Sequence, residues 1–422
     1  MNKLDLVIPK GNSWEELLQQ KLLPPFATVL TNFAQDLSKQ LLQQGKSYPE
    51  LMALGFWLRR ANLSRLELEF TEKNTFDQFR LPQGLVFHIA PANVDTLFVY
   101  SWMLALLVGN KNFLRLPTQD TPQLNLLLAA IGRLLDEDRY VELSKRNMLV
   151  RYGHIDEINR KASINCDVRV LWGGDGTVES LRKFPLPPTA RELNFADKFS
   201  LALLDAQEVL DCKSFEQLIQ HFCNDAFGFD QRACSSPRLV IWIGSEYQVK
   251  QAQEKFWWGV QHRITEQPPP ISLHLRMEKL VTQYQLSIED GVQVPVSTTA
   301  YVNRIELPSL DKLPTDLHCG GGLFYEFSVH DLEELIPVFS KKIQTISIFG
   351  VSGDNLRQLL SINLCAGVDR IVPIGKALDF HHHWDGYDLL SEFSRSIIVS
   401  KGLIPDVHSK STGFINPKSN RK

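Results

Sequence analysis

The sequence has few cysteines and little excess charge of either sign. Six cysteines are too few for a disulfide scaffold in a chain of 422 residues, and none forms a C-x-x-C pair. Lys and Arg number 45 against 48 Asp and Glu, so the formal net charge of -3 offers no strong field for holding nucleic acid or an anionic membrane. We therefore expect reduced thiols and a small-molecule substrate.

Long hydrophobic runs are also missing. The longest, over 97–108, is interrupted by Ser101 and falls short of the roughly 20 residues that cross a bilayer. The first residues, Met1 to Leu6, show neither a signal-peptide nor a transit-peptide pattern. We expect a cytoplasmic protein with no integral membrane segment.

The composition that is present is ordinary for a globular protein, with 44% hydrophobic and 22% charged residues. The length predicts two domains or one elaborated α/β unit. Apolar residues at helical spacing over 14–44, and again over 49–65, predict two helices that lead into the rest of the chain.

From Leu85 onward, short apolar runs alternate with amphipathic stretches, a pattern typical of βα units and a largely parallel sheet. Asp95 is placed to cap one of the helices and Gly109 to end it. The predicted strands are 85–90, 112–116, 147–152 and 167–172, with helices over 96–108, 122–135 and 156–164. A second α/β series follows, with strands over 201–204, 238–243 and 344–349 and helices over 214–226, 247–262 and 275–284.

Three segments stand where a predicted strand meets a helix or a loop: 84–93, 172–178 and 229–237. In open α/β sheets, ligands bind outside the carboxyl ends of the strands. These segments are therefore candidate site positions.

Together they resemble the aldehyde dehydrogenase superfamily, and more closely its acyl-CoA reductase branch of the LuxC type, which supplies aldehyde to bacterial luciferase. The resemblance covers roughly 84–384 and rests on several motifs in the family's order. Ala90-Pro-Ala-Asn93 is similar to the superfamily's Pro-Trp-Asn-Phe-Pro turn, 107–117 to its Gly-Asn…Lys-Pro strand, 199–205 to the strand after Glu-Leu-Gly-Gly-Lys, and Gln231-Arg-Ala-Cys234 to its Gly-Gln-x-Cys loop. The segments 367–375 and 384–387 close the pattern as in LuxC-type chains.

The resemblance implies an aldehyde dehydrogenase-like α/β fold with a Rossmann-like cofactor domain and a catalytic domain. The expected division is a helical lead-in at 1–65, an NADP-binding domain at 66–204, a catalytic domain at 205–366, and a return segment with a C-terminal arm at 367–422. We expect this arm either to be loose or to dock on a neighbouring subunit, since a homo-oligomer is among the expected assemblies.

Cys234 is the predicted nucleophile, because a thiolate attacks thioesters and aldehydes well and nearby N–H dipoles or cations can lower its pKa. The alternative is a buried structural cysteine. Asn93 is predicted to donate to the oxyanion together with the Cys234 backbone N–H. The alternative for Asn93 is an ordinary turn residue.

Gly173 and Gly174 end a predicted strand before a helix-like run that begins at Thr177, so bare backbone can approach a pyrophosphate there. A simple turn is the alternative. Arg115 takes the place of the family's ribose-binding lysine, and Thr118 falls where NAD-specific members often carry glutamate. A cation without a carboxylate suits a 2′-phosphate, so NADPH is the predicted cofactor, unless Arg115 is only a solvated charge.

The sequence also departs from the family pattern. Asn194 aligns with the glutamate that activates water in oxidising aldehyde dehydrogenases, and Glu192 could replace that base only after a two-residue slip. The second family glutamate, which contacts the nicotinamide ribose, is not recoverable around 318–326. His88 is predicted to be structural, and no metal site is expected at 381–383 because consecutive side chains of an extended segment point to alternate sides.

The activity implied is NADPH-dependent reduction of an acyl thioester, fatty acyl-CoA or a related donor, to an aldehyde through a cysteine acyl-enzyme. An acyl-donor protein is a possible partner. Two alternatives stay open: an NAD(P)-dependent aldehyde dehydrogenase, and a cofactor-free acyl-transfer or acyl-binding subunit.

Overall fold

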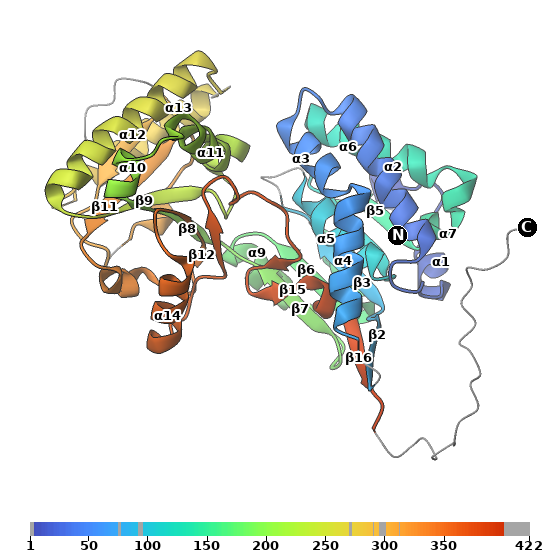
Figure 1. Ribbon diagram of the computed structural model, residues 1–422. Helices are drawn as coiled ribbons and strands as arrows, with labels where there is room; N and C mark the ends of the chain where they lie inside the picture. Colours follow the sequence, from blue (N-terminus) through green and yellow to red (C-terminus); the bar gives the residue numbers. More distant parts are fainter. Residues whose placement is uncertain are drawn as a thin grey trace, which may run out of the picture.

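The computed structural model describes residues 4–74, 77–91, 96–269, 272–289, 291–294, 301–311 and 313–400. Within these residues the chain forms two six-stranded sheets, each covered by helices on both faces, and the two α/β units lie side by side (Figure 1). The predicted α/β class with two sheet-based units is confirmed. The residue boundaries proposed for the domains stay a prediction.

The first sheet has the order β1-β5-β4-β3-β6-β7. All neighbours are parallel except β1, which pairs antiparallel to β5. Side chains of β3 and β6 are buried along their whole length, as expected for central parallel strands covered on both faces. The strands are β1 (Leu6–Ile8), β3 (Leu85–Ile89), β4 (Lys111–Arg115), β5 (Asn147–Arg151), β6 (Val168–Trp172) and β7 (Arg191–Phe195).

Helices cover this sheet on two sides. One side carries the apolar α5 (Leu97–Leu107) and α6 (Pro122–Leu135), and the other carries α8 (Asp156–Asn165) and α9 (Asp175–Arg182). Gly109 follows α5 with φ 98°, and a Cβ there would lie 2.1 Å from the carbonyl oxygen of Leu23. The predicted helix stop at this glycine is confirmed. Asp95, the predicted cap, lies outside the described residues.

The helical lead-in differs from the prediction of two helices. It contains β1 and four helices: α1 (Trp14–Gln19), α2 (Thr28–Gln44), α3 (Pro49–Trp57) and α4 (Arg60–Glu72). Pro24 and Pro25 separate α1 from α2, because proline lacks the N–H that a helix interior needs. The side chains of α2, α3 and α4 join the same apolar core as α5 and α6.

The second sheet is parallel throughout, with the order β10-β11-β9-β8-β12-β13. The predicted strands and helices of this series are present; most have longer bounds, and the helix predicted over 214–226 is shifted by one residue. The strands are β8 (Phe199–Asp205), β9 (Pro237–Ile243), β10 (Asn303–Glu306), β11 (Leu323–Val329), β12 (Ile343–Phe349) and β13 (Arg370–Pro373). One face carries α10 (Ala206–Leu210), α11 (Phe215–Phe227) and α12 (Glu246–Glu266), and the other carries α13 (Leu273–Leu286), η4 (Leu332–Val338) and α14 (Gly353–Asn363).

After β13 the chain returns to the first unit, as the orange and red ribbon of Figure 1 shows. Its last strand, β16 (Ser394–Ile398), pairs antiparallel with β2 (Gln78–Pro82). Trp384 and Phe393 pack into the core of the first unit. The remaining short elements are η1 (Asp138–Tyr140), α7 (Val141–Ser144), η2 (Gly228–Gln231), η3 (Thr315–Leu317), β14 (His383–Trp384), β15 (Tyr387–Asp388) and α15 (Leu389–Glu392).

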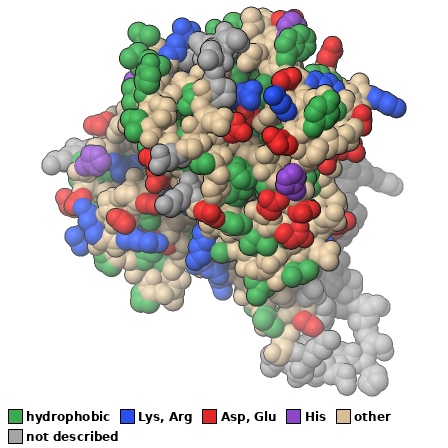
Figure 2. Space-filling model, turned by 90° about the vertical axis from the view of Figure 1, so that its left-hand side faces the viewer, with side chains coloured by type: hydrophobic (Ala, Val, Ile, Leu, Met, Phe, Trp, Pro, Cys, Tyr) green, Lys and Arg blue, Asp and Glu red, His purple; other side chains and the backbone are tan. Residues whose placement is uncertain are grey.

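Acidic and basic side chains are mixed over the face of the molecule shown in Figure 2, in keeping with the small net charge. None of the helices among the described residues combines the length and the apolar character that a membrane crossing requires.

Candidate active site

The carboxyl edge of the first sheet faces the amino edge of the second, and Cys234 lies between them. A pocket of about 450 Å³ opens at this place. The loops after β3, β4, β6 and β7 line it, and so does the loop that precedes β9. Because β3 and β6 are the neighbours at which the strand order reverses, the pocket lies at the topological switch point where α/β sheets bind ligands.

The predicted cofactor residues all line this pocket together with Cys234; they are Arg115, Thr118, Gly173, Gly174 and Thr177. Gly174 is the N-cap of α9, so the first N–H groups of this helix lie beside the pocket. A Cβ on Gly173 would lie 3.0 Å from the Thr177 side chain, and one on Gly174 would lie 3.0 Å from Oδ2 of Asp197. The absence of side chains at these two glycines therefore lets Thr177 and Asp197 pack closely against this loop.

Arg115 extends from the end of β4. Its guanidinium lies 4.8 Å from the ring centroid of Tyr152 and donates to the carbonyl of Gly153 at 3.3 Å. Among the described residues no carboxylate forms an ion pair with Arg115, so its charge is available to an anion in the pocket.

The loop that carries Cys234 has an unusual backbone. Phe229, Asp230 and Gln231 have φ of 53°, 54° and 60°, a left-handed conformation that costs non-glycine residues energy. Surrounding contacts compensate for this cost. The fully buried Gln231 side chain donates to the carbonyls of Pro237 and Leu323, both at 3.0 Å, and accepts the N–H of Gly322 at 2.8 Å.

A side chain of β8 holds the backbone of Cys234 in place. The Ser200 hydroxyl donates to the Cys234 carbonyl at 2.6 Å and accepts the N–H of Thr345 at 3.1 Å. Ser200 therefore ties the nucleophile loop to two strands of the second sheet.

The thiol of Cys234 does not have the lowered pKa that its predicted role suggested. Burial raises the pKa to about 11, and the negative charges of Asp385 and Asp197 also raise it. Arg238 and the backbone N–H of Lys198 oppose this shift without overcoming it. Cations and N–H dipoles can lower the pKa of a thiol, but at Cys234 the desolvation of the thiolate outweighs them.

Two further pockets among the described residues meet at Cys234. One, of about 610 Å³, has mostly polar walls that include Asp197, Lys198 and Arg238. The other measures only about 20 Å³ and is apolar, with Trp172 and Trp384 in its wall. Three spaces thus meet at the sulfur: the 450 Å³ pocket, called the cofactor-sized pocket below, the polar pocket and the small apolar recess.

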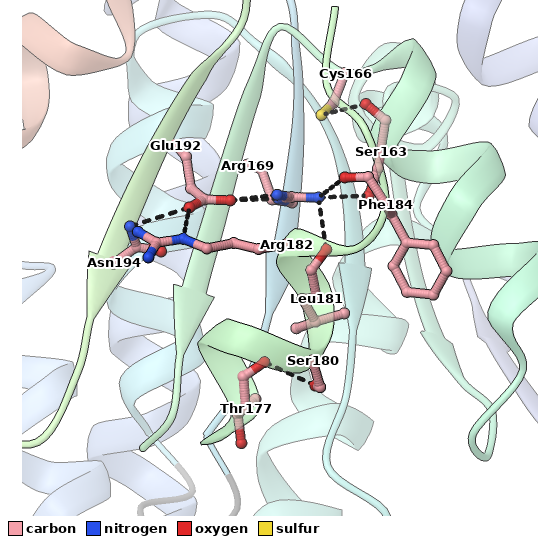
Figure 3. Close-up of polar contacts among 10 residues, drawn as sticks. All are labelled: Ser163, Cys166, Arg169, Thr177, Ser180, Leu181, Arg182, Phe184, Glu192 and Asn194. Carbon is pink, nitrogen blue, oxygen red and sulfur yellow. Dashed lines mark hydrogen bonds and ion pairs between the residues drawn. The ribbon is translucent and has the colours of Figure 1, made fainter. Parts of the chain in front are cut away.

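Asn93 lies outside the described residues, so its predicted oxyanion role stays a prediction. In the described part of the chain, neither Asn194 nor Glu192 lines a pocket with Cys234. Glu192 is held between Arg169 and Arg182, each donating to it at 2.9 Å, and Asn194 donates to Glu192 at 3.1 Å (Figure 3). Burial works against the charge of Glu192, but these two arginines hold its pKa below the usual value.

Among the described residues, Asp197 is the carboxylate that lines both larger pockets with Cys234, whereas Glu278 and Asp316 line the polar pocket alone. Sequence reasoning missed Asp197, along with His154 and Arg232 in the cofactor-sized pocket. The signal that could have found Asp197 is its place directly after β7, the same position that the recognised site residues hold after β3, β4 and β6.

His88 is fully buried, with Nδ1 3.2 Å from Ser101 Oγ and Nε2 3.1 Å from Asn112 Oδ1. Burial lowers its pKa to about 4, so the ring is a neutral structural group, as predicted. His381 and His382 are also neutral, because burial lowers their pKa values to about 4 and about 3. The chain bends at His382, so the argument that these side chains alternate along an extended segment does not hold.

Known proteins resemble this chain in sequence and in fold. The model of the family described as acyl-CoA reductase (LuxC) matches residues 31–266, more than half of the chain. Two long-chain acyl-protein thioester reductases, from Photorhabdus luminescens and Photorhabdus laumondii subsp. laumondii, are 25% and 24% identical over 302 residues. Each match covers 70% of this chain and 58% of the relative, so the chain spans less than two thirds of the length of these curated relatives.

Similar solved structures are aldehyde dehydrogenases. Methylmalonate-semialdehyde dehydrogenase from Oceanimonas doudoroffii is 13% identical with a TM-score of 0.64, over 92% of this chain and 87% of that chain. Glyceraldehyde-3-phosphate dehydrogenase from Methanocaldococcus jannaschii, complexed with NADP, is 14% identical with a TM-score of 0.62, over 92% and 91%. At these identities the likeness shows a shared fold.

Proposed function

The chain belongs to the LuxC family of acyl-CoA reductases, and from this premise we propose that it reduces an acyl thioester to an aldehyde with NADPH, through an acyl group held on Cys234. The observation that supports this most is one pocket lined by Cys234 and by all five predicted cofactor residues. A thiol nucleophile next to a cofactor-sized pocket suits hydride transfer to a carbonyl that the protein holds covalently.

The first step is thiol exchange. The Cys234 sulfur forms a bond to the thioester carbonyl carbon, the bond from that carbon to the donor sulfur breaks, and the donor leaves as a thiol. Because the Cys234 thiol is protonated at neutral pH, a group beside it must take its proton. We assign this role to Asp197, the carboxylate that lines both larger pockets with Cys234, and the departing thiolate is the final acceptor of the proton.

The cofactor-sized pocket fits a nicotinamide dinucleotide, which when bound would supply hydride to the acyl carbon. Gly173, Gly174 and the start of α9 would hold the pyrophosphate through backbone N–H groups. Arg115 would pair with a 2′-phosphate, which favours NADPH over NADH. Asn93 and the Cys234 backbone N–H would stabilise the oxyanion.

The acyl donor remains a choice between CoA and an acyl-carrying protein. The polar pocket beside Cys234 offers Lys198, Arg232 and Lys342, which suit an anionic donor arm. The names of the Photorhabdus relatives describe acyl-protein thioester reductases, so an acylated protein is the donor that we propose to test beside acyl-CoA.

The central experiment follows the acyl group. Incubation with acyl-CoA in the absence of NADPH should add one acyl mass to the intact protein, and Cys234→Ser should show no such adduct. Addition of NADPH should then release aldehyde. An equal adduct on the variant would contradict the role of Cys234, and Cys365→Ser is the control for modification of another partly exposed thiol.

A second candidate function, oxidation of an aldehyde with NAD or NADP, is favoured by the aldehyde dehydrogenases among the structural neighbours. Aldehyde plus NADP, without thiol, should give free acid quickly if this function holds and only slowly if the chain is a reductase. Failure to bind either nicotinamide cofactor in calorimetry would favour a cofactor-free acyl-transfer subunit instead.

A further inference from the structure

Three consecutive imidazoles gather where the return segment reaches the first unit. The metal-binding atoms of His381, His382 and His383 all lie within 4.8 Å of one another. The ring centroids of neighbouring residues are 4.6 Å and 4.2 Å apart, and the outer two rings are 5.3 Å apart. This clustering is uncommon for adjacent residues, whose side chains point to opposite sides in an extended chain.

Local hydrogen bonds set the bend that brings the rings together. The Tyr100 hydroxyl donates to the carbonyl of His381, and the backbone N–H of His383 donates to Nδ1 of His381 at 3.1 Å. The short strand β14 begins only at His383. The three rings therefore share one side because the chain turns at His382.

The buried member of the group faces a carboxylate on α4. The His382 side chain is 4% exposed, and its Nδ1 lies 3.1 Å from Oε2 of Glu69. Both atoms are buried and neither makes a hydrogen bond of standard geometry among the described residues, so the contact that each makes is with the other. A buried imidazole nitrogen and a carboxylate oxygen that face each other without a well-formed hydrogen bond are placed as two ligands of one ion would be.

From this geometry we propose that His381, His382, His383 and Glu69 bind one divalent cation of the zinc class. Imidazole nitrogen and carboxylate oxygen are borderline and hard donors that Zn²⁺ accepts together. Bonds of about 2.0–2.2 Å place tetrahedral ligand atoms roughly 3.3 Å apart. The 3.1 Å separation of His382 Nδ1 and Glu69 Oε2 is close to this value.

The histidine ligand atoms must approach one another further, because they lie within 4.8 Å of one another and a tetrahedral shell needs roughly 3.3 Å. His383 is exposed and its ring can turn without disturbing the core. Four protein ligands would complete a tetrahedral shell, which is the pattern of a structural site.

Some nearby charges would strengthen the binding of a cation at this site, and others would weaken it. Oδ1 of Asp388 lies 3.9 Å from Nε2 of His382, where it can orient the ring and add negative charge. Arg65 Nε lies 3.8 Å from Oε1 of Glu69, and Lys73 pairs with Asp388, so two cations compete for the same carboxylates. This competition predicts weaker binding than the same ligands would show without the two cations.

A cation here would join α4 to the return segment directly before Trp384. Trp384 lines the small apolar recess beside Cys234. The proposed ion would thus stabilise the segment that closes this side of the active site, while the ligands themselves stay outside the pockets that meet at Cys234.

The test uses the full chain after treatment with a chelator. Titration with ZnCl₂ in a calorimeter should show one ion per chain, and Co²⁺ should give a tetrahedral visible spectrum without a thiolate charge-transfer band. His382→Ala and Glu69→Gln should each weaken binding at least tenfold and remove the rise in Tm that Zn²⁺ causes in the parent chain. His383→Ala, at an exposed position that should not affect folding, should also weaken binding.

The matched control is His262→Ala, which removes an exposed histidine 3.4 Å from Glu266 on α12, a similar pair without further ligands. It should bind Zn²⁺ as the parent chain does. Lack of saturable binding, a thiolate band with Co²⁺, or unchanged affinity in His383→Ala and Glu69→Gln would overturn the proposal.

Discussion

The two sheet edges that face each other across Cys234 are held in different ways. On the carboxyl edge of the first sheet, local geometry supplies the site residues: Arg115 ends β4 and Thr118 comes soon after it, and Gly173 and Gly174 follow β6. On the amino edge of the second sheet, Cys234 depends on distant contacts. Gln231 reaches Leu323, 92 positions away, and Ser200 reaches Thr345, 145 positions away.

This difference has a physical origin. Parallel strands deliver the following residues to one edge, so the cofactor side needs only short loops that leave space. The nucleophile loop instead contains three consecutive left-handed residues, which the chain adopts only where the surroundings impose them. Damage to a single contact should therefore cost more at the second edge than at the first.

The largest effect should come from Gln231→Ala. It removes the buried partner of the Pro237 carbonyl and of the Gly322 N–H, while the Leu323 carbonyl keeps Nε2 of His318 at 2.7 Å, and each unsatisfied group costs about 1–3 kcal/mol. We expect the free energy of unfolding to fall by about 3–5 kcal/mol, together with slower acylation of Cys234. Urea unfolding and the rate of adduct formation measure the two effects.

Gln220→Ala is the control for this change, because Gln220 is on the solvent-facing side of α11 and bonds only to Asn224 within the described residues. Its effect should stay within about 0.5 kcal/mol. Equal losses of stability in the two variants would show that the buried hydrogen bonds of Gln231 stabilise the fold no more than the exposed hydrogen bond of Gln220 does.

Asp225→Asn should have the next largest effect, through pH. The fully buried Asp225 on α11 accepts the N–H groups of Gly375 at 2.6 Å and Ala377 at 3.0 Å, which holds the start of the return segment. Burial raises the pKa of Asp225 from 3.8 to about 7. Between those two values the folded state holds a proton that the unfolded state has lost, so its contribution is greatest below pH 4, falls as the pH rises to 7, and is constant above.

The free energy of unfolding should fall by about 4 kcal/mol over this range, because the pKa rises by about three and each pKa unit corresponds to about 1.36 kcal/mol. An asparagine does not titrate, so the difference in unfolding free energy between parent and variant should change over this pH range. Urea titrations at several pH values measure it, with Asp354→Asn at the exposed start of α14 as the control. Parallel curves for parent and Asp225→Asn would contradict the raised pKa.

At the first edge, Arg115→Ala should leave folding intact and change cofactor choice. Charge-assisted hydrogen bonds to a phosphate contribute about 1.5–3 kcal/mol, so the KM for NADPH should rise on the order of 10–100-fold while that for NADH changes little. Steady-state kinetics with both cofactors test this. Equal losses for the two cofactors would assign Arg115 to a part of the dinucleotide that they share.

More of the fold than of the candidate site could be predicted from the sequence. The strands over 85–90, 112–116 and 167–172 were predictable because buried parallel strands are short apolar runs, and the glycines after β6 were visible as a break in the pattern. The elements of the helical lead-in were not predictable, because the separation of α1 from α2 at Pro24 and the pairing of β1 with β5 depend on tertiary contacts. The raised pKa of the Cys234 thiol was equally hidden, since it comes from burial between two units.

Asn194→Glu should produce the smallest effect. Its alignment with the family's hydrolytic glutamate predicted that a carboxylate at this position would hydrolyse the acyl group on Cys234. The structure places Asn194 on β7, where its side chain donates to Glu192 and where, in the described part of the chain, it lines no pocket with the sulfur. A general base must come within hydrogen-bond reach of the attacking water, directly or through one further water.

We therefore expect Asn194→Glu to change the release of free acid from a pre-formed acyl-enzyme less than about twofold, because geometry precedes pKa in acid–base catalysis. The new carboxylate would instead face the carboxylate of Glu192 and weaken its pairing with Arg182. Asp197→Asn is the variant to compare with it, because Asp197 lines a pocket with Cys234. This substitution should slow the acylation of Cys234 and should also lower the slow hydrolysis that the parent shows. A large increase in free acid from Asn194→Glu would support the alignment of Asn194 with the hydrolytic glutamate of the family. It would also require the β7 loop to move toward the sulfur during the reaction.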